Sequence, residues 1–265
     1  MNVLFIGDIF GKAGRKIIRN KLPALIKEFK IECTIANGEN VAGGKGITRR
    51  TANQLIRAGV DIFTSGNHLW DRRESLDFIK QSEIILKPAN FPEQAYGKDW
   101  ILYTTKKNNN IAVINFTGQA FMHSAHSPYS VLDKYLPLIN KKTKNIIIDF
   151  HAEATAEKRA FGFYCNGKVS AVLGTHTHIQ TADEEILSNG TGYITDVGMT
   201  GPHDSVIGIK KKIILKKVTT GMPERYEPSK KGLQLNAVLL NIDNDGKTKE
   251  IKRIKRKYDD ENFKS

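Results

Sequence analysis

The amino-terminal part of the sequence repeats one pattern three times: a short apolar run ends at polar residues and is followed by a segment with helical periodicity. The apolar runs are residues 3–7, 34–36 and 60–64, and the helical segments are residues 15–29, 48–58 and 73–81. Strands that alternate with helices are typical of an α/β fold whose ligand-binding residues lie at one edge of the sheet. The pattern therefore predicts an α/β protein with its chemistry at the carboxyl ends of the strands.

The remaining sequence adds strands that are not all parallel. Apolar residues 100–105 and 111–116 flank an Asn-rich turn, which predicts an antiparallel hairpin. Further strands are predicted at residues 84–86, 145–150, 169–173, 193–197, 206–219 and 235–242, and a helix at residues 129–139. Because no repeat or linker interrupts the chain, we expect a single domain over residues 1–265. Its polar, basic carboxyl-terminal tail is expected to start at about residue 249 and to be frayed over residues 259–265.

Composition narrows the class of protein. The chain has 41 basic and 28 acidic residues and a formal net charge of +13, which favours anionic partners. Its lysines are spread along the sequence, which is more typical of a solvated surface than of a dedicated nucleic-acid interface. Cys33 and Cys165 are too few for a disulfide scaffold or a zinc ribbon. No signal peptide is recognised and no apolar run approaches the roughly 20 residues of a membrane span, so we expect a cytoplasmic protein with no membrane partner.

The sequence Gly-Thr-His-Thr-His at residues 174–178 follows directly after a predicted strand. If that strand is buried, we expect the chain to continue extended, and its period of two places His176 and His178 on one side and Thr177 on the other. Two imidazoles at a strand end form a candidate metal site. The alternative is a pair of surface histidines in a turn, and residues elsewhere in the chain have to decide between the two.

Five predicted strand ends carry side chains that bind metals or transfer protons. They are Asp8, Glu39 with Asn40, Asn67 with His68, His151, and His176 with His178. Any one of these could instead cap a helix, serve a turn or be a hydrogen-bonded core residue. Their equivalent positions along an α/β pattern favour a common site. Apart from His68, the two carboxylates, two amides and three imidazoles exceed the needs of one zinc and suit a dinuclear metal centre with a bridging carboxylate.

These ordered motifs resemble those of the calcineurin-like metallophosphoesterase superfamily. The segments IGDIFGKAGR, ANGENVAGGKGIT, SGNHLWD and TDVGMTGPHDSVIG more closely resemble the YmdB-like branch, and the similarity runs from residue 1 to about residue 241. The resemblance implies an α/β sandwich of two mixed β-sheets flanked by α-helices. It also implies a hydrolase, a metal-dependent phosphodiesterase acting on 2',3'-cyclic nucleotides.

The motifs depart from the wider superfamily at two positions. Phe10 stands where a histidine usually follows the first aspartate, and Glu39 with Asn40 stands where an aspartate is usual, so Asn40 is expected to replace the absent histidine. The resemblance then implies two metals bridged by Glu39, the first held by Asp8, Asn40 and His178 and the second by Asn67, His151 and His176. Mixed nitrogen and oxygen ligands favour iron or manganese, allow zinc and disfavour magnesium.

A dinuclear centre of this kind suits phosphoryl transfer, because two cations can activate a hydroxide and neutralise charge on the phosphate oxygens. His68 is next to Asn67 but is not counted as a ligand, so we assign it the role of general acid that protonates the leaving oxygen. Its alternative is a hydrogen-bonded loop histidine. His123, His126 and His203 lie in polar loops and receive no role. Residues 43–46 are expected to form a flexible turn, because they lack the spacing of a P-loop.

Two alternative functions stay open. The same centre could serve a phosphomonoesterase or an RNA nuclease. The positive charge also fits a non-catalytic RNA- or protein-binding regulator in which metal is structural. For partners we expect a small nucleotide phosphodiester as substrate and a homo-oligomer, with RNA as an unproven further partner.

Overall fold

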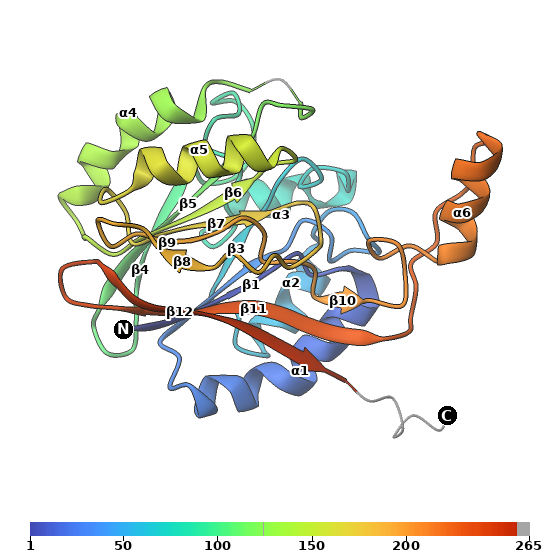
Figure 1. The fold of residues 1–265 in the computed structure, drawn as a ribbon, viewed down its shortest axis with the longest axis horizontal. Coiled ribbons are helices and arrows are strands. Elements are labelled where there is room, and N and C mark those ends of the chain that lie inside the picture. The colour runs from blue at the N-terminus through green and yellow to red at the C-terminus, as the bar shows by residue number, and fades with distance from the viewer. Residues whose placement is uncertain (124, 259–265) are drawn as a thin grey trace.

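A computed structural model describes residues 1–123 and 125–258 of the chain. Two β-sheets pack face to face, and helices cover their outer faces (Figure 1). The elements in chain order are β1 (Asn2–Ile6), α1 (Gly11–Glu28), β2 (Cys33–Asn37), α2 (Arg49–Ile56), β3 (Ile62–Thr64), the 3-10 helix η1 (Arg73–Ser75), α3 (Leu76–Gln81), β4 (Trp100–Thr104), β5 (Asn110–Thr117), α4 (Pro128–Asn140), β6 (Ile146–His151), α5 (Thr155–Cys165), β7 (Ala171–Thr175), β8 (Glu185–Ile186), β9 (Gly192–Ile194), β10 (Gly201–Pro202), α6 (Lys211–Thr220), β11 (Leu233–Ile242) and β12 (Thr248–Lys257).

Both sheets are mixed, as the α/β sandwich prediction requires. The first has the strand order β10-β11-β1-β2-β3, with β12 also paired to β11. In it β1, β2 and β3 run parallel and β11 runs antiparallel to β1. The second has the order β4-β5-β6-β7-β9-β8, in which β5, β6, β7 and β9 run parallel. The predicted fold class is therefore confirmed.

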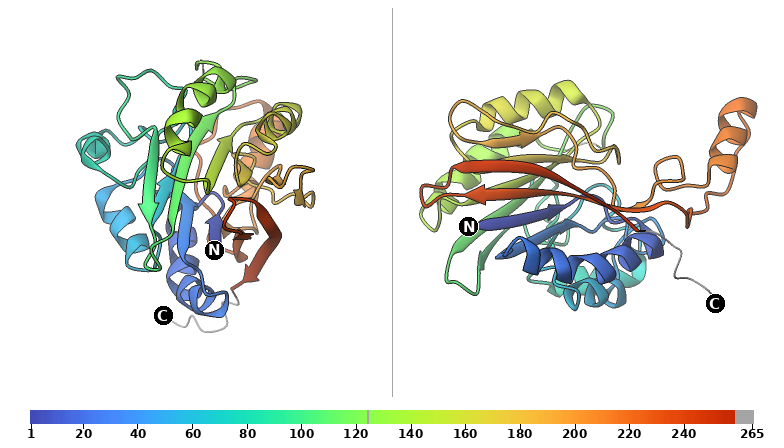
Figure 2. Two further views of the ribbon diagram at one scale, coloured as in Figure 1. Left: turned by 90° about the vertical axis from the view of Figure 1, so that its left-hand side faces the viewer. Right: turned by 60° about the horizontal axis from the view of Figure 1, so that its bottom comes forward.

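Figure 2 shows the layers of sheets and helices from two further sides. Three apolar clusters hold these layers together. The cluster between the sheets includes Phe5 of β1 and Ile147 of β6. On the outer faces, Leu4 belongs to the cluster that contains residues of α1 and α2, and Phe150 to the cluster that contains residues of α4 and α5. Because helices cover the outer faces, the parallel strands are buried on both sides and read as continuous apolar runs. For this reason short apolar runs located most strands in the sequence.

Most predicted elements are present, with boundaries that shift by a few residues. Thr48 caps α2 as predicted, since its hydroxyl accepts a hydrogen bond from Thr51 N–H at 3.2 Å. Residues 84–86, predicted as a strand, form only isolated bridges. Helix α5 has no counterpart in the sequence-based prediction.

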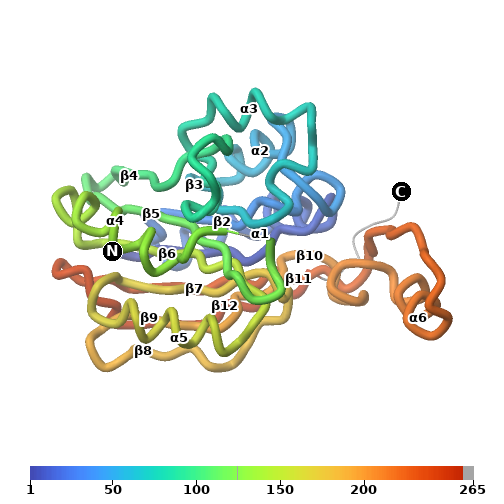
Figure 3. The backbone as a smooth tube through the Cα atoms, turned by 90° about the horizontal axis from the view of Figure 1, so that it is seen from above, coloured from blue at the N-terminus to red at the C-terminus, as the bar shows by residue number. Residues whose placement is uncertain are grey.

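The prediction of a strand over residues 206–219 is wrong, because Lys211–Thr220 form α6. β-Branched residues such as Ile214 and Val218 favour strands, but their spacing of four also suits one side of a helix. Gly221, in the left-handed conformation with φ of +69°, ends the helix. No residue of α6 is buried, and the helix projects away from the sandwich (Figure 1 and Figure 3).

The segment expected as a basic tail from about residue 249 is a strand as far as Lys257. Strand β12 pairs with β11 along its length and buries Ile254, while most of its lysines and arginines are exposed. Charged side chains on an edge strand discourage pairing with other chains. Residues 259–265, expected to be frayed, lie outside the described residues. Within the described ranges, no helix is long and apolar enough to cross a membrane.

Candidate metal centre

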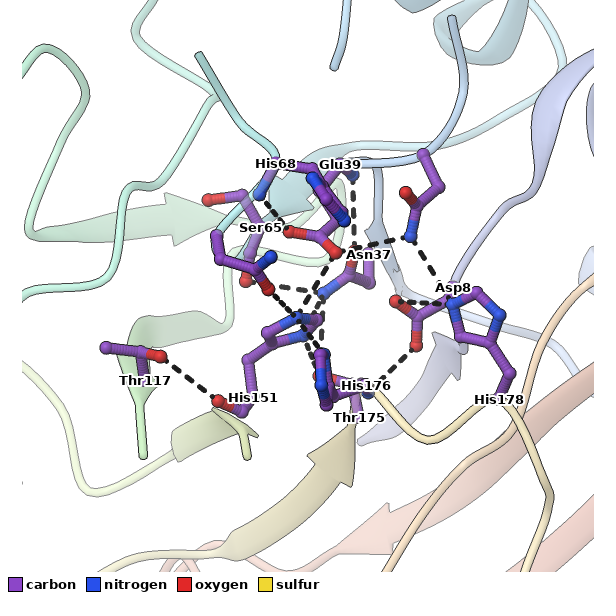
Figure 4. Close-up of polar contacts among 12 residues, drawn as sticks. Asp8, Asn37, Glu39, Ser65, His68, Thr117, His151, Thr175, His176 and His178 are labelled. Carbon is purple, nitrogen blue, oxygen red and sulfur yellow. Dashed lines mark hydrogen bonds and ion pairs between the residues drawn. The ribbon is translucent and has the colours of Figure 1, made fainter. Parts of the chain in front are cut away.

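All seven predicted ligands lie together where the carboxyl ends of strands from both sheets meet. Figure 4 labels five of them, Asp8, Glu39, His151, His176 and His178. Three strands of the first sheet and two of the second deliver them: Asp8 follows β1, Glu39 and Asn40 follow β2, Asn67 follows β3, His151 ends β6, and His176 and His178 follow β7. Asn67 and His176 are partly exposed and the other five are buried. Solvent therefore reaches the cluster next to Asn67 and His176, whereas the other five side chains are enclosed by the protein.

One group of contacts centres on His151. Its Nε2 lies 3.2 Å from Glu39 Oε1, 3.2 Å from Asn67 Oδ1 and 3.1 Å from His176 Nδ1. The ligand atoms of Glu39, His151 and His176 all lie within 4.8 Å of one another. Four donor side chains that converge in this way suit the coordination of one cation.

A second group centres on His178. Its Nε2 lies 3.4 Å from Asn40 Nδ2 and 3.7 Å from Asp8 Oδ1. Asn40 Nδ2 also donates a hydrogen bond to Glu39 Oε1 at 3.2 Å, so Glu39 contacts both groups. Asp8 Oδ1 is buried and has no hydrogen-bond partner among the described residues. Because an unpartnered buried carboxylate oxygen is costly, this atom is explained if it binds a cation.

Each imidazole of the cluster is held through the nitrogen that faces away from the other ligands. The contacts are His151 Nδ1 to Thr175 Oγ1 at 2.8 Å, His176 Nε2 to Glu153 Oε2 at 2.9 Å, and His178 Nδ1 to the Ile207 carbonyl at 3.1 Å. Histidines that bind metals are oriented in this way by carboxylates and carbonyls. The donor set, the orphaned oxygen and the ring orientations together fit a metal centre.

Burial and charge oppose each other in the cluster. Burial acts to raise the pKa of Glu39. His151 and the backbone N–H of His68 act in the opposite direction and more strongly, so that the pKa of Glu39 is lowered to about 2. Burial acts to lower the pKa of His151, but the neighbouring carboxylate of Glu39 has the larger effect and raises the pKa of His151 to about 9. Burial raises the pKa of Asp8. Burial and the neighbouring His151 lower the pKa of His176 to about 3. A bound cation would favour ionised carboxylates and neutral imidazoles throughout the cluster.

The expectation that residues 174–178 stay extended is wrong. Strand β7 ends at Thr175, and both His176 and His178 have positive φ, +100° and +67°. The chain therefore turns, and His176 contacts His151 while His178 contacts Asp8. Positive φ is uncommon for residues other than glycine, so such a turn has to be held by its surroundings.

A buried ion pair holds this turn. Asp196 Oδ2 accepts hydrogen bonds from the N–H and the hydroxyl of Thr177, at 3.0 and 2.7 Å. The Lys158 side chain, 1% exposed, reaches from α5 to Asp196 Oδ2 at 2.8 Å and to the Thr175 carbonyl at 2.7 Å. Sequence reasoning missed both residues. Asp196 lies at the end of a predicted strand, which is a usable signal, whereas Lys158 lies in the helix that was not predicted.

Asn37 and Asp149 join the two sheets beside the ligands. Asn37 Nδ2, at the end of β2, donates a hydrogen bond to Asp149 Oδ2 of β6 at 3.1 Å. The Thr175 hydroxyl donates to Asp149 Oδ1 at 2.6 Å. Burial raises the pKa of Asp149 to about 7. These contacts fix the spacing between ligands that come from different sheets.

His68 lies beside the cluster and is oriented by its neighbours. Its backbone N–H donates a hydrogen bond to Glu39 Oε2 at 2.9 Å, and its ring Nδ1 lies 2.9 Å from Asp71 Oδ2. The Asp71 contact occupies Nδ1, which makes Nε2 the nitrogen available to a substrate.

Residues 43–46, expected to form a flexible turn, are held by Arg72, whose guanidinium donates to backbone carbonyls of this loop and of Ala42.

The histidines that received no role lie outside the ligand cluster. His203 Nε2 contacts the Met199 carbonyl at 2.9 Å. The backbone of His126 contacts Asn90. His123 lines a cavity together with Asn67 and His176.

The two sheets and the strand-end cluster define the class of the protein, an α/β sandwich of the metallophosphoesterase type. The crystal structure of a 5'-nucleotidase precursor from Thermus thermophilus shares this fold, with a TM-score of 0.56 and 11% identity over 96% of this chain and 54% of that one. The model of the family described as YmdB-like protein matches residues 4–254. The chain belongs to the YmdB-like family, and the resemblance found in its motifs is confirmed.

Two relatives are similar over almost their whole length. The chain is 44% identical over 256 residues to the 2',3'-cyclic-nucleotide 2'-phosphodiesterase of Bacillus subtilis, covering 97% of this chain and 96% of that protein. The crystal structure of a novel phosphatase from Mycoplasma pneumoniae matches with a TM-score of 0.91 and 34% identity, over 97% of this chain and 93% of that one.

The buried ion pair gives a testable prediction. Lys158→Met leaves the Asp196 carboxylate buried without its cation, and we expect the free energy of unfolding of the metal-free protein to fall by roughly 3–5 kcal/mol in urea denaturation. Lys134→Met is the matched control, because Lys134 forms an exposed ion pair with Glu93 and such pairs contribute at most about 1 kcal/mol. Equal, small effects of the two substitutions would show that the pair does not hold the turn.

Proposed function

We propose that this protein is a metal-dependent phosphodiesterase that hydrolyses 2',3'-cyclic nucleotides at a centre of two metal ions. The observation that carries the proposal is the division of the seven side chains into two groups, both in contact with Glu39. One ion would be held by Asp8, Asn40 and His178 and the other by Asn67, His151 and His176, with Glu39 as the bridge. The choice of substrate rests on the 44% identity to the cyclic-nucleotide phosphodiesterase of B. subtilis.

The donor set restricts the metals. Three imidazoles combined with carboxylate and amide oxygens favour iron or manganese, allow zinc and disfavour magnesium. When bound, two such ions activate water and neutralise charge on the phosphate oxygens. The protein orients these ligands through Thr175, Glu153 and the Ile207 carbonyl, which fix the three rings.

His68 is proposed as the general acid. Asp71 fixes its Nδ1, so Nε2 is directed to a substrate and donates a proton to the ribose oxygen that leaves. The backbone N–H of His68 donates a hydrogen bond to the carboxylate of Glu39, so the proposed general acid is connected to the proposed bridging ligand. His68 is partly exposed, and solvent can therefore return its proton after each turnover.

The setting that we propose is the cytoplasm. Cys33 and Cys165 are both free and buried, which agrees with a reducing compartment. The homo-oligomer and the contact with RNA stay predictions.

The proposed activity is tested on purified protein prepared under reducing conditions. We expect bound metal by elemental analysis and hydrolysis of 2',3'-cyclic AMP that chelation abolishes and metal restores. Asp8→Asn should lose this activity, because it removes the charge of a proposed ligand. Absence of both bound metal and metal-restored hydrolysis would falsify the proposal. Hydrolysis of RNA or of phosphomonoesters, but not of the cyclic nucleotide, would assign the centre to a different reaction.

The assignment of ligands to ions predicts two different partial losses. His178→Ala should empty the site shared with Asp8 and Asn40, whereas His176→Ala should empty the site shared with Asn67 and His151. Elemental analysis and anomalous-scattering maps of crystals grown from each variant measure which ion remains. His203→Ala serves as the control and should keep both ions, because His203 lies outside the cluster. Loss or retention of both ions alike in the two ligand variants would contradict the division.

The role of His68 predicts a dependence on the leaving group. His68→Ala should keep its metals and hydrolyse 2',3'-cyclic AMP more slowly by about 10²- to 10⁴-fold, the usual contribution of a general acid. It should act nearly as fast as the wild type on bis-p-nitrophenyl phosphate, whose leaving group needs no proton. Asp71→Asn is expected to give a smaller loss. An equal loss on both substrates would show that His68 is not the acid.

A further inference from the structure

A cavity of about 270 Å³ adjoins the candidate metal centre. It is lined by Asn67, Phe121, Met122, His123 and His176. Asn67 and His176 belong to the proposed ligands, so the cavity starts where the phosphate of a substrate would bind. The other three residues belong to the segment that follows β5, the strand beside β6 in the second sheet.

Phe121 is the most exposed large apolar residue at this place. The residue is 91% exposed, although aromatic rings are usually placed in cores and interfaces. Its φ is +61°, in the left-handed region that bulky residues seldom adopt. An exposed ring in an unusual backbone conformation, at the rim of a polar cavity, is a candidate contact for a ligand.

Hydrogen bonds connect the backbone just before Phe121 to the candidate metal centre. Glu157 of α5 accepts hydrogen bonds from Gln119 N–H at 2.7 Å and from Ala120 N–H at 3.4 Å. Gly118 N–H donates to the carbonyl of His151 at 3.0 Å. The segment therefore leaves the sheet directly beside a proposed metal ligand, and its start is fixed by side-chain and backbone contacts.

Asn90 forms hydrogen bonds with Thr117 and His126, which lie before and after Phe121 in the chain. Its Oδ1 accepts from Thr117 N–H at 2.9 Å, and its Nδ2 donates to the carbonyls of Thr117 and His126 at 2.8 and 2.9 Å. Because both sides are anchored, Phe121 is presented at the cavity without being buried in the core.

We propose that Phe121 is the platform on which the base of the nucleotide substrate stacks. This inference rests on the proposed function. In a nucleoside 2',3'-cyclic phosphate only the ribose separates the phosphate from the base, so a phosphate at the metal centre brings the base to the adjoining cavity. Every base has a π face, and an aromatic side chain binds it without reading its hydrogen-bonding edge. The platform thus gives affinity for nucleotides with tolerance for different bases.

The test compares two cyclic phosphodiesters with the metal-loaded protein. Both 2',3'-cyclic AMP and glycerol 1,2-cyclic phosphate contain a five-membered cyclic phosphate, but only the first has a base. Phe121→Ala should lower kcat/KM for 2',3'-cyclic AMP roughly tenfold, mostly through KM, because one stacking contact is lost. Phe121→Leu, which keeps an apolar side chain, should behave like Phe121→Ala, and Phe121→Trp should keep the wild-type value. Hydrolysis of glycerol 1,2-cyclic phosphate should not change in any of the three.

The matched control and a binding measurement separate the outcomes. Phe163→Ala removes an exposed aromatic ring of α5 outside the cavity and should change neither substrate. In metal-loaded Phe121→Trp, AMP but not glycerol phosphate should quench the added indole fluorescence. Equal losses on both substrates in Phe121→Ala, full activity in Phe121→Leu, or an unquenched indole would overturn the inference. If the wild-type protein hydrolyses neither substrate, the proposed function fails, and the fluorescence measurement still decides whether a base stacks here.

Discussion

The contact between Glu39 and His151 is the interaction on which the rest of the structure depends. It joins a carboxylate that follows β2 in the first sheet to an imidazole that ends β6 in the second, at 3.2 Å. Both side chains are buried, and a buried charge without a partner is costly. The two sheets therefore meet at their carboxyl ends. Asn40 follows the same strand as Glu39, and the other proposed ligands reach this place from the neighbouring strands β1, β3 and β7.

Around this contact, the remaining polar network sets the geometry before any ligand binds. Asn37 and Asp149 link the sheets, and Lys158 with Asp196 holds the turn between His176 and His178. Groups fixed in this way need little rearrangement to receive metal ions, which is the main requirement of a precise site. The cost is a core that contains several buried polar groups, and each of those described above has a hydrogen-bond partner among the described residues except Asp8 Oδ1.

The proposed metal centre and the proposed platform for the base lie on different parts of the fold. The proposed ligands stand at strand ends of a rigid sandwich, whereas Phe121 stands on an anchored loop after β5. Loops can change in sequence without disturbing the sheets that hold the site. The arrangement would allow the proposed metal centre to be combined with different substrate preferences.

The sequence by itself determined most of the strands and the residues at their ends, because strands buried on both faces read as apolar runs and the polar residues after them stand out. It could not show that Lys211–Thr220 form a helix, since β-branched residues suit both an exposed helix and a strand. Only the tertiary structure decided which partners orient the side chains of the cluster and how the chain turns at His176 and His178. Those features depend on polar contacts between residues far apart in the chain, such as Lys158 with Asp196, and a local pattern of burial does not encode such contacts.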